Sequence, residues 1–305
     1  MIKKRIILLY GPTASGKSKL ALDIAKKFNG EIINADSMQV YKELNILTSR
    51  PSTADMKKIK HHLYGFISVK KNFSVGVWHN LAAKKIKEVI KKNKMPIVVG
   101  GTGLYFKVLI EGLSEIPEVP KLDMNLNFLE RRSLISNYSR KYPGIFKGIN
   151  LNDRQRVYRA ISVYENTGTP LWKWYKNKNK KIYFKSKNFL KIFLNPAKPE
   201  LENRIKKRFD QMLKHGAIQE TENFKKIKIG LLNSANFIIG LKEISQFLNQ
   251  QIGMKELKEK VLIRSRQYAK RQFTWQRGQM KDWKGFGDTN YLDLRKKVLG
   301  YLSKT

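Results

Sequence analysis

Apolar runs alternate with amphipathic stretches along the first third of the chain. Short apolar runs at 5–10, 31–35 and 95–99 are separated by the stretches 17–28 and 81–92, in which apolar residues recur at helical spacing. Strands and helices that alternate in this way are typical of a parallel sheet covered by helices on both faces. The runs 6–9 and 96–99 are apolar at every position, as expected of central strands buried on both sides.

The pattern becomes more polar and helical from about Gly112. Segments 124–142 and 153–167 have helical character, and prolines at 117, 120 and 143 punctuate them. An apolar strand-like run then follows at 189–194, with amphipathic stretches at 201–214, 256–270 and 292–301. We therefore expect a catalytic core formed by 1–112 and 188–305, and an inserted, mostly helical subdomain at 113–187.

A phosphate-binding motif lies between the first strand and the first helix. Residues 11–18 read GPTASGKS, which fits the pattern G-x-x-x-x-G-K-[ST] in its expected context. Backbone N–H groups of such a loop and the positive end of the following helix hold phosphate oxygens. We predict an α/β fold with a P-loop core and a parallel sheet flanked by helices. The predicted phosphate-binding residues are Gly11, Pro12, Thr13, Ala14, Ser15, Gly16, Lys17 and Ser18.

Within this motif, Lys17 is expected to neutralise the outer phosphate. The hydroxyl of Ser18 is expected to bind a magnesium ion that bridges phosphate oxygens. Mg²⁺ is thus the predicted cofactor and Ser18 the predicted metal ligand.

Most proteins with such a loop are NTPases or kinases, in which an acidic residue at the end of a buried strand helps to hold magnesium. The strand 95–99 ends instead in Gly100-Gly101-Thr102-Gly103, which suggests a second set of amides and a hydroxyl facing more phosphate or a closely approaching substrate. The acidic candidate is Asp36, after the strand 31–35, over the crevice of a parallel sheet. Its position leaves three roles open: a magnesium ligand through water, a general base, or a cap of the following turn.

The charge of the chain points to a polyanionic partner. Its 305 residues include 62 Lys and Arg against 24 Asp and Glu, a formal net charge of +38. Such an excess attracts nucleic acid through steering and counterion release, although runs of charge are also common on solvated surfaces. The basic, aromatic-rich segment 172–187 is open to both interpretations, as a loop that contacts RNA or as a mobile solvated hairpin.

Other classes of site are excluded by composition. The chain has no cysteine, which rules out disulfides, thiolate zinc sites and a cysteine nucleophile. Its four histidines, at 61, 62, 79 and 215, lack the spacing of a metal site and are expected to be structural. The apolar run after the basic N-terminus stops at the glycine loop, and no run reaches the roughly 18 residues of a membrane span. We expect a cytoplasmic protein.

Taken together, the motifs resemble the tRNA dimethylallyltransferases, also called tRNA isopentenyltransferases, in their bacterial form without a zinc-finger extension. The resemblance covers nearly the whole chain and rests on GPTASGKS at 11–18, DSMQVY at 36–41, RPST at 50–53, HHL at 61–63, GGTGLY at 100–105, NDRQRVYRA at 152–160, RF at 208–209, IGLKE at 239–243, and YAKRQ at 268–272 with TW at 274–275.

This resemblance implies an activity and a set of site residues. The family transfers a dimethylallyl group from its diphosphate to the exocyclic amine of the adenosine 3′ of the anticodon. The resemblance implies that the phosphate loop holds dimethylallyl diphosphate. It also implies that the catalytic residues are Asp36, Lys17, Thr102 and Arg208. The implied tRNA-binding residues are Asp36, Ser37, Met38, Gln39, Thr102, Gln155, Arg156, Val157, Tyr158 and Arg159.

The expected partners are therefore tRNA, through its anticodon stem-loop gripped by the insertion, and dimethylallyl diphosphate. We expect a monomer without membrane contact. Two alternatives share the phosphate loop: a small-molecule or nucleotide kinase, and a non-catalytic basic RNA-binding protein.

Overall fold

Two units make up the chain. The computed structural model describes residues 5–71, 73–120, 122, 126–176, 180–230, 233–287 and 290–305. The first unit comprises the chain up to Ile110, then Tyr183–Ile229 and the part from Asn233 onward, and the second is mainly Glu111–Ile182. Positions 123–125, where a predicted helix begins, and 177–179 of the basic segment lie outside the described residues.

A six-stranded sheet forms the centre of the first unit. The strand order is β3-β2-β4-β1-β7-β8, and every neighbouring pair is parallel. The strands are β1 (Ile6–Tyr10), β2 (Gly30–Asn34), β3 (His61–His62), β4 (Met95–Gly100), β7 (Phe189–Leu194) and β8 (Lys284–Phe286). All positions of β1 and β2 are buried, because helices cover the sheet on both faces. The predicted α/β fold is confirmed.

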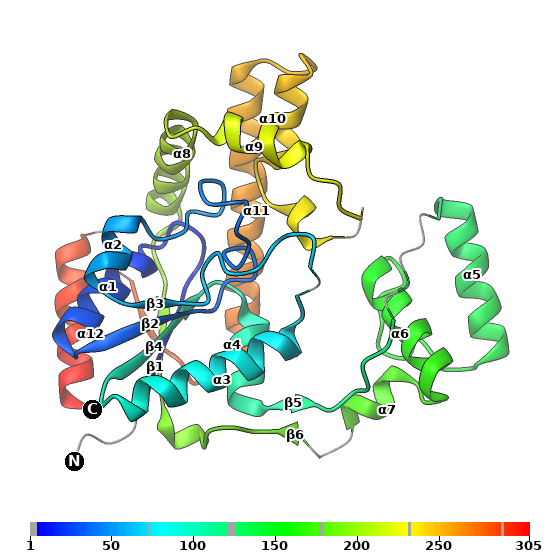
Figure 1. The fold of residues 1–305 in the computed structure, drawn as a ribbon, viewed down its shortest axis with the longest axis horizontal. Helices are drawn as coiled ribbons and strands as arrows, with labels where there is room; N and C mark the ends of the chain where they lie inside the picture. Colours follow the sequence, from blue (N-terminus) through cyan, green and yellow to red (C-terminus); the bar gives the residue numbers. More distant parts are fainter. Residues whose placement is uncertain are drawn as a thin grey trace. The chain divides into compact units, whose positions relative to one another are not determined.

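Helices from distant parts of the sequence cover the two faces (Figure 1). On one face, α1 (Lys17–Lys27) and α12 (Tyr291–Lys304) pack in one core with Ile7, Leu9 and Val99. On the other face lie α3 (Val75–Lys91) and α4 (Gly103–Glu111), where the ring of Tyr10 meets that of Phe106 edge to face at 5.6 Å. The carboxyl ends of β1, β2 and β4 thus lie at one edge of a sandwiched sheet.

A second core of the first unit lies among helices that follow β7. The helices are α8 (Lys198–Lys214), α9 (Ala217–Lys225), α10 (Leu241–Leu248) and the long α11 (Met254–Gln279), in olive to orange in Figure 1. Phe209, Ile244 and Val261 from these helices pack with Val40 and Leu44 from the segment between β2 and α2 (Thr53–Lys58). This packing fixes the chain that follows Asp36 against α8.

The second unit is mostly helical. It contains α5 (Phe128–Lys141), α6 (Arg154–Thr167) and α7 (Leu171–Lys176), with an antiparallel pair of short strands, β5 (Leu113–Ser114) and β6 (Lys180–Lys181). The basic segment begins within α7, where Trp172 donates its indole N–H to the carbonyl of Gly144 at 3.0 Å. Residues 172–176 are therefore a helix, and neither a loop nor a hairpin as the sequence suggested.

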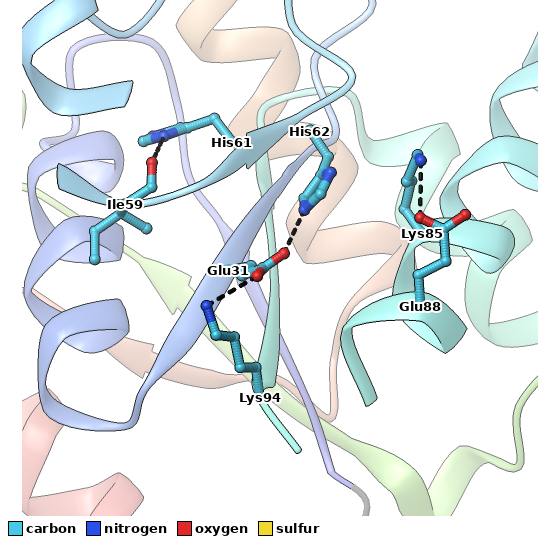
Figure 2. A network of polar contacts seen from close by, with 7 residues as sticks. All are labelled: Glu31, Ile59, His61, His62, Lys85, Glu88 and Lys94. Carbon is cyan, nitrogen blue, oxygen red and sulfur yellow. Dashed lines mark hydrogen bonds and ion pairs between the residues drawn. The ribbon is translucent and has the colours of Figure 1, made fainter. Parts of the chain in front are cut away.

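A buried polar cluster stabilises the edge of the sheet at β2 and β3 (Figure 2). The carboxylate of Glu31, 1% exposed, lies 2.7 Å from His62 Nε2 and 3.0 Å from Lys94 Nζ. Burial acts to raise the pKa of Glu31, but hydrogen bonds from His62 and Lys94 outweigh it and the pKa is lowered. His61, on the same strand, bonds to the carbonyl of Ile59 through Nδ1 instead.

None of the described helices is both long enough and apolar enough to cross a membrane.

Candidate active site

The phosphate loop lies where the motif predicts, between β1 and α1. Gly16 has φ of +86°, in the left-handed region that glycine adopts without strain, and it leads directly into the helix. Ser15 donates its N–H to the carbonyl of Pro12 at 3.2 Å, and the amine of Lys17 donates to the same carbonyl at 3.2 Å. The loop is thus a tight turn whose lysine folds back over it.

Two helices from the C-terminal half support this loop. Ala14 packs against Leu201 and Ile205 of α8 and Ala269 of α11. The guanidinium of Arg204 lies 3.9 Å from where a Cβ on Gly16 would be. Because positions i and i+4 share a helix face, Arg204 and the predicted Arg208 lie on the same side of α8.

Lys17, Arg208 and Asp36 interact electrostatically. Burial lowers the pKa of Lys17 to about 8, while the carboxylate of Asp36 opposes the shift and the charge of Arg208 adds to it. Burial likewise lowers the pKa of Arg208, and Asp36 again opposes this. The structure therefore brings together three of the four predicted catalytic residues as two cations near one carboxylate. This excess of positive charge suits a dianionic or trianionic ligand.

Asp36 is fixed by its own turn after β2. Its N–H donates to Asn34 Oδ1 at 2.8 Å, and its Oδ1 accepts the N–H of Met38 at 3.0 Å. No helix begins between Asp36 and Thr53, so the carboxylate caps a turn and not a helix. The cap uses Oδ1, and among the described residues no hydrogen bond to Oδ2 is present. Capping and a chemical role are therefore compatible.

Four tyrosines interact electrostatically with this carboxylate. Burial is the main cause that raises the pKa of each phenol, and the charge of Asp36 raises each one further. They come from four separate elements and are Tyr10, Tyr64, Tyr105 and Tyr268. The ring of Tyr105 stacks on Trp78 at 4.2 Å between centroids. Because these phenols keep their protons at neutral pH, they add no negative charge near Asp36.

Thr102, the fourth predicted catalytic residue, contacts the Asp36 turn directly. Its Oγ1 accepts the N–H of Ser37 at 2.9 Å, and its own N–H donates to the carbonyl of Ala35 at 3.2 Å. The residues on both sides of Asp36 are thereby tied to the segment after β4.

Gly100, the last residue of β4, and two glycines that follow it, Gly101 and Gly103, lie close to other parts of the protein. A Cβ on Gly100 would overlap the backbone of Ala35, one on Gly101 the amide of Gln272, and one on Gly103 the indole of Trp275. These contacts with protein explain the three glycines. The N–H of Thr102 is used within the protein and is not available to phosphate, whereas a role of the N–H groups of Gly101 and Gly103 stays a prediction.

The predicted tRNA-binding residues divide into accessible and buried ones. In α6, Gln155 and Arg156 are exposed and Arg159 is partly exposed. Val157 and Tyr158 are 0% and 2% exposed and pack with Ile145 in the core of the second unit. We correct the prediction for these two: their side chains form the core and are not available to RNA.

On the Asp36 turn, Ser37, Met38 and Gln39 are partly exposed. Met38 packs against the second core. The amide of Gln39 donates to the carbonyls of Thr48 at 2.8 Å and Ser49 at 2.9 Å, so its two donor hydrogens are used within the protein.

The hydroxyl of Ser18 suits a magnesium ion bound together with a diphosphate. It is exposed on the first turn of α1, and within the described ranges it makes no hydrogen bond. Those ranges also hold no cluster of three His, Asp or Glu that could cage a metal. Magnesium commonly takes one or two protein oxygens and completes its shell with phosphate oxygens and water, which is the donor set available here.

Three residues of the site, Arg204, Tyr268 and Gln272, were not among the predicted site residues. Arg204 lies one turn before Arg208 at helical spacing, which could have identified it. Tyr268 and Gln272 lie within a block used for the family resemblance, but nothing local showed that they face Asp36 and the phosphate loop.

Comparison with known proteins identifies a family to which the chain is similar. The model of the family described as IPP transferase matches residues 39–279. A tRNA dimethylallyltransferase of Pelagibacter ubique is 44% identical over 286 residues, covering 92% of this chain and 91% of that protein. That of Parvibaculum lavamentivorans is 38% identical over 305 residues, with coverages of 98% and 96%.

Solved structures lead to the same family. A tRNA Δ(2)-isopentenylpyrophosphate transferase from Staphylococcus epidermidis superposes with a TM-score of 0.68 at 32% identity, covering 98% of both chains. A eukaryotic dimethylallyltransferase acting on tRNA has a TM-score of 0.77 at 26% identity, covering 95% of this chain and 75% of that one. With the family model matching well over half of its residues, the chain belongs to the IPP transferase family.

Proposed function

We propose that this protein transfers a dimethylallyl group from dimethylallyl diphosphate to the N6 amine of the adenosine 3′ of the anticodon in tRNA, releasing diphosphate. The observation that carries the proposal is the carboxylate of Asp36, which is fixed on its turn through Asn34 and Met38 and interacts electrostatically with Lys17 and Arg208. The relatives named above are tRNA dimethylallyltransferases, and the net charge of +38 suits an RNA substrate.

The chemistry needs no phosphoryl transfer. The lone pair of the adenosine amine attacks C1 of the dimethylallyl group, the bond from C1 to the diphosphate oxygen breaks, and its electron pair leaves with diphosphate. Lys17 and Arg208 stabilise the charge that develops on the leaving group. The second carboxylate oxygen of Asp36 accepts a hydrogen bond from the amine and then its proton.

Magnesium is the proposed cofactor. When bound by Ser18 and the diphosphate, it would neutralise charge on the leaving group. Asp36 is not a proposed magnesium ligand, because its Oδ1 caps the turn and its Oδ2 accepts the hydrogen bond from the adenosine amine.

The second unit is the proposed grip on the anticodon stem-loop. Gln155, Arg156 and Arg159 lie on the accessible side of α6 and offer polar and cationic contacts to RNA. The target adenosine must leave its stack to reach a diphosphate at a sheet edge, which costs a few kcal/mol and costs least in a single-stranded loop.

The test is incubation with labelled dimethylallyl diphosphate, magnesium and an anticodon stem-loop that contains the target adenosine. Label should enter the RNA, and Lys17→Met should abolish transfer with unchanged RNA binding. ATP supplied in place of the prenyl diphosphate separates the alternatives. Its turnover without prenyl transfer would indicate a kinase, and binding of RNA without either reaction would indicate a passive RNA-binding protein.

A further inference from the structure

A buried glutamine on α11 connects the phosphate loop with the segment after β4. Gln272 is 4% exposed. Its Oε1 accepts the N–H of Thr13 at 2.8 Å, and its Nε2 donates to the carbonyl of Gly101 at 2.9 Å. Its main-chain carbonyl also accepts the hydroxyl of Tyr10 at 2.9 Å. One residue of a distant helix thus holds the end of β1, the loop that follows it, and the end of β4.

The same path continues to Asp36. Thr102, next to Gly101, bonds to Ala35 through its N–H and to Ser37 through its Oγ1. Asp36 lies between these two residues. A chain of hydrogen bonds through Gln272 and Thr102 therefore holds the carboxylate of Asp36 in place relative to the phosphate loop.

The bond to Thr13 also changes what the loop can offer a ligand. Amides of a phosphate loop ordinarily point at phosphate oxygens, but the N–H of Thr13 is committed to Gln272. Glutamine suits this place because its planar head carries an acceptor and a donor at once. Gly101 belongs to the same contact, since a Cβ there would overlap Nε2 of Gln272.

We infer that Gln272 is a positioning residue that sets the distance between the diphosphate held by the loop and the carboxylate of Asp36. The inference rests on the proposed function. Both polar groups of the Gln272 side chain are bonded within the protein, so its loss should act on the catalytic step more than on binding. A displacement of about 1 Å at a reacting centre is enough to slow it about 100-fold.

Gln272→Met tests this, because it keeps the length of the side chain and removes both bonds. We expect kcat for transfer to fall at least about tenfold, with the KM for the RNA within about threefold of wild type. Thr221→Val is the matched control. Thr221 is 0% exposed, and its hydroxyl bonds to the carbonyl of Ala217 within α9. Among the described residues it makes no hydrogen bond to the phosphate loop or to the segment after β4. The substitution should lower the free energy of unfolding and leave kcat unchanged.

Gly101→Ala gives a second, independent route, since it displaces Gln272 without replacing it. The two substitutions break one contact, so the double variant should be about as slow as the slower single variant. Losses of kcat that multiply, or a wild-type kcat in either single variant, would overturn the inference.

A readout without catalysis separates this inference from the proposed function. Hydrogen–deuterium exchange of backbone amides is measured by mass spectrometry in the phosphate loop at 11–18 and in the segment 100–105. Because the N–H of Thr13 and the carbonyl of Gly101 bond to Gln272, exchange in both segments should be faster in Gln272→Met and unchanged in Thr221→Val. Unchanged exchange in Gln272→Met contradicts the positioning role even if the protein proves to have another activity.

Discussion

The side-chain oxygen of Thr102 accepts a hydrogen bond from the main-chain nitrogen of Ser37 at 2.9 Å. Thr102 follows β4 and Ser37 follows β2, and these strands are neighbours in the sheet. The bond therefore holds the Asp36 turn against the end of β4. Because β4 pairs with β1, it also lies beside the strand that leads into the phosphate loop. The bond thus connects the turn that carries the proposed base to the segment after β4, and it does not involve the carboxylate itself.

Replacing Thr102 by valine should slow transfer. Valine keeps the shape but leaves the N–H of Ser37 unpaired, which loosens the turn that carries Asp36. We expect kcat to fall about 10- to 100-fold, with a smaller change in the KM for dimethylallyl diphosphate. Thr102→Ser keeps the hydroxyl and should remain close to wild type. Equal rates for the two variants would contradict this role.

Binding of the diphosphate should weaken above about pH 8. Lys17 carries its charge below its pKa of about 8 and loses it as the pH rises through that value. The kcat/KM for dimethylallyl diphosphate, which reports the free enzyme, should fall about tenfold per pH unit beyond this point. In Arg208→Gln the midpoint should move to higher pH, because Arg208 lowers the pKa of Lys17. A flat profile up to about pH 10 would show that the charge of Lys17 is not required.

Much of the core could be predicted because its evidence is local. The apolar run of β1 and the motif at 11–18 define strand, loop and helix between Ile6 and Lys27, and the apolar run of β4 defines a further strand. The contacts of Gly100, Gly101 and Gly103 are long-range, however, and a run of glycines looks alike whether it faces phosphate or a buried Gln272 and Trp275. For the same reason the tyrosines around Asp36 could not be found, since they come together only in the fold.

The sequence motif also did not show which positions of α6 are buried. The block NDRQRVYRA mixes core and surface positions, and only the packing of Val157 and Tyr158 against Ile145 separates them. The accessible remainder, Gln155, Arg156 and Arg159, stays a prediction for RNA contact.

Variants on the two faces of α6 should therefore behave differently. Arg156 is exposed, and its ion pair with Asp153 at 3.1 Å is solvated, so Arg156→Ala should change the free energy of unfolding by less than about 0.5 kcal/mol. It should weaken RNA binding and lower the salt dependence of that binding by about one ion. Val157→Ala should instead destabilise the fold by about 1–3 kcal/mol. Titrations at several salt concentrations and urea unfolding measure both, and unchanged RNA affinity in Arg156→Ala would remove α6 from the interface.

Acid should destabilise the first unit through the cluster of Glu31 and His62. The pKa of His62 is lowered by burial, and that of Glu31 is lowered by its hydrogen-bond donors, which outweigh its burial. In both cases the unfolded chain takes up the proton first, so stability falls with the pH below about 6.5 for His62 and below about 4.3 for Glu31. In Glu31→Gln, urea unfolding should no longer show the loss of stability that Glu31 causes below about pH 4.3. Glu256→Gln, in an exposed pair with Lys260, is the control and should retain it.

The most direct test of the central claim is the rate of the chemical step in Asp36→Asn. Wild-type and variant protein are saturated with dimethylallyl diphosphate, magnesium and the anticodon stem-loop, and RNA carrying the label is followed in a single turnover. Because asparagine can cap the turn through its oxygen but cannot take up the amine proton, we expect the step to slow at least about 100-fold while the affinity for RNA stays within a few-fold. A variant that binds RNA normally and transfers at the wild-type rate would contradict the assignment of Asp36 as the base.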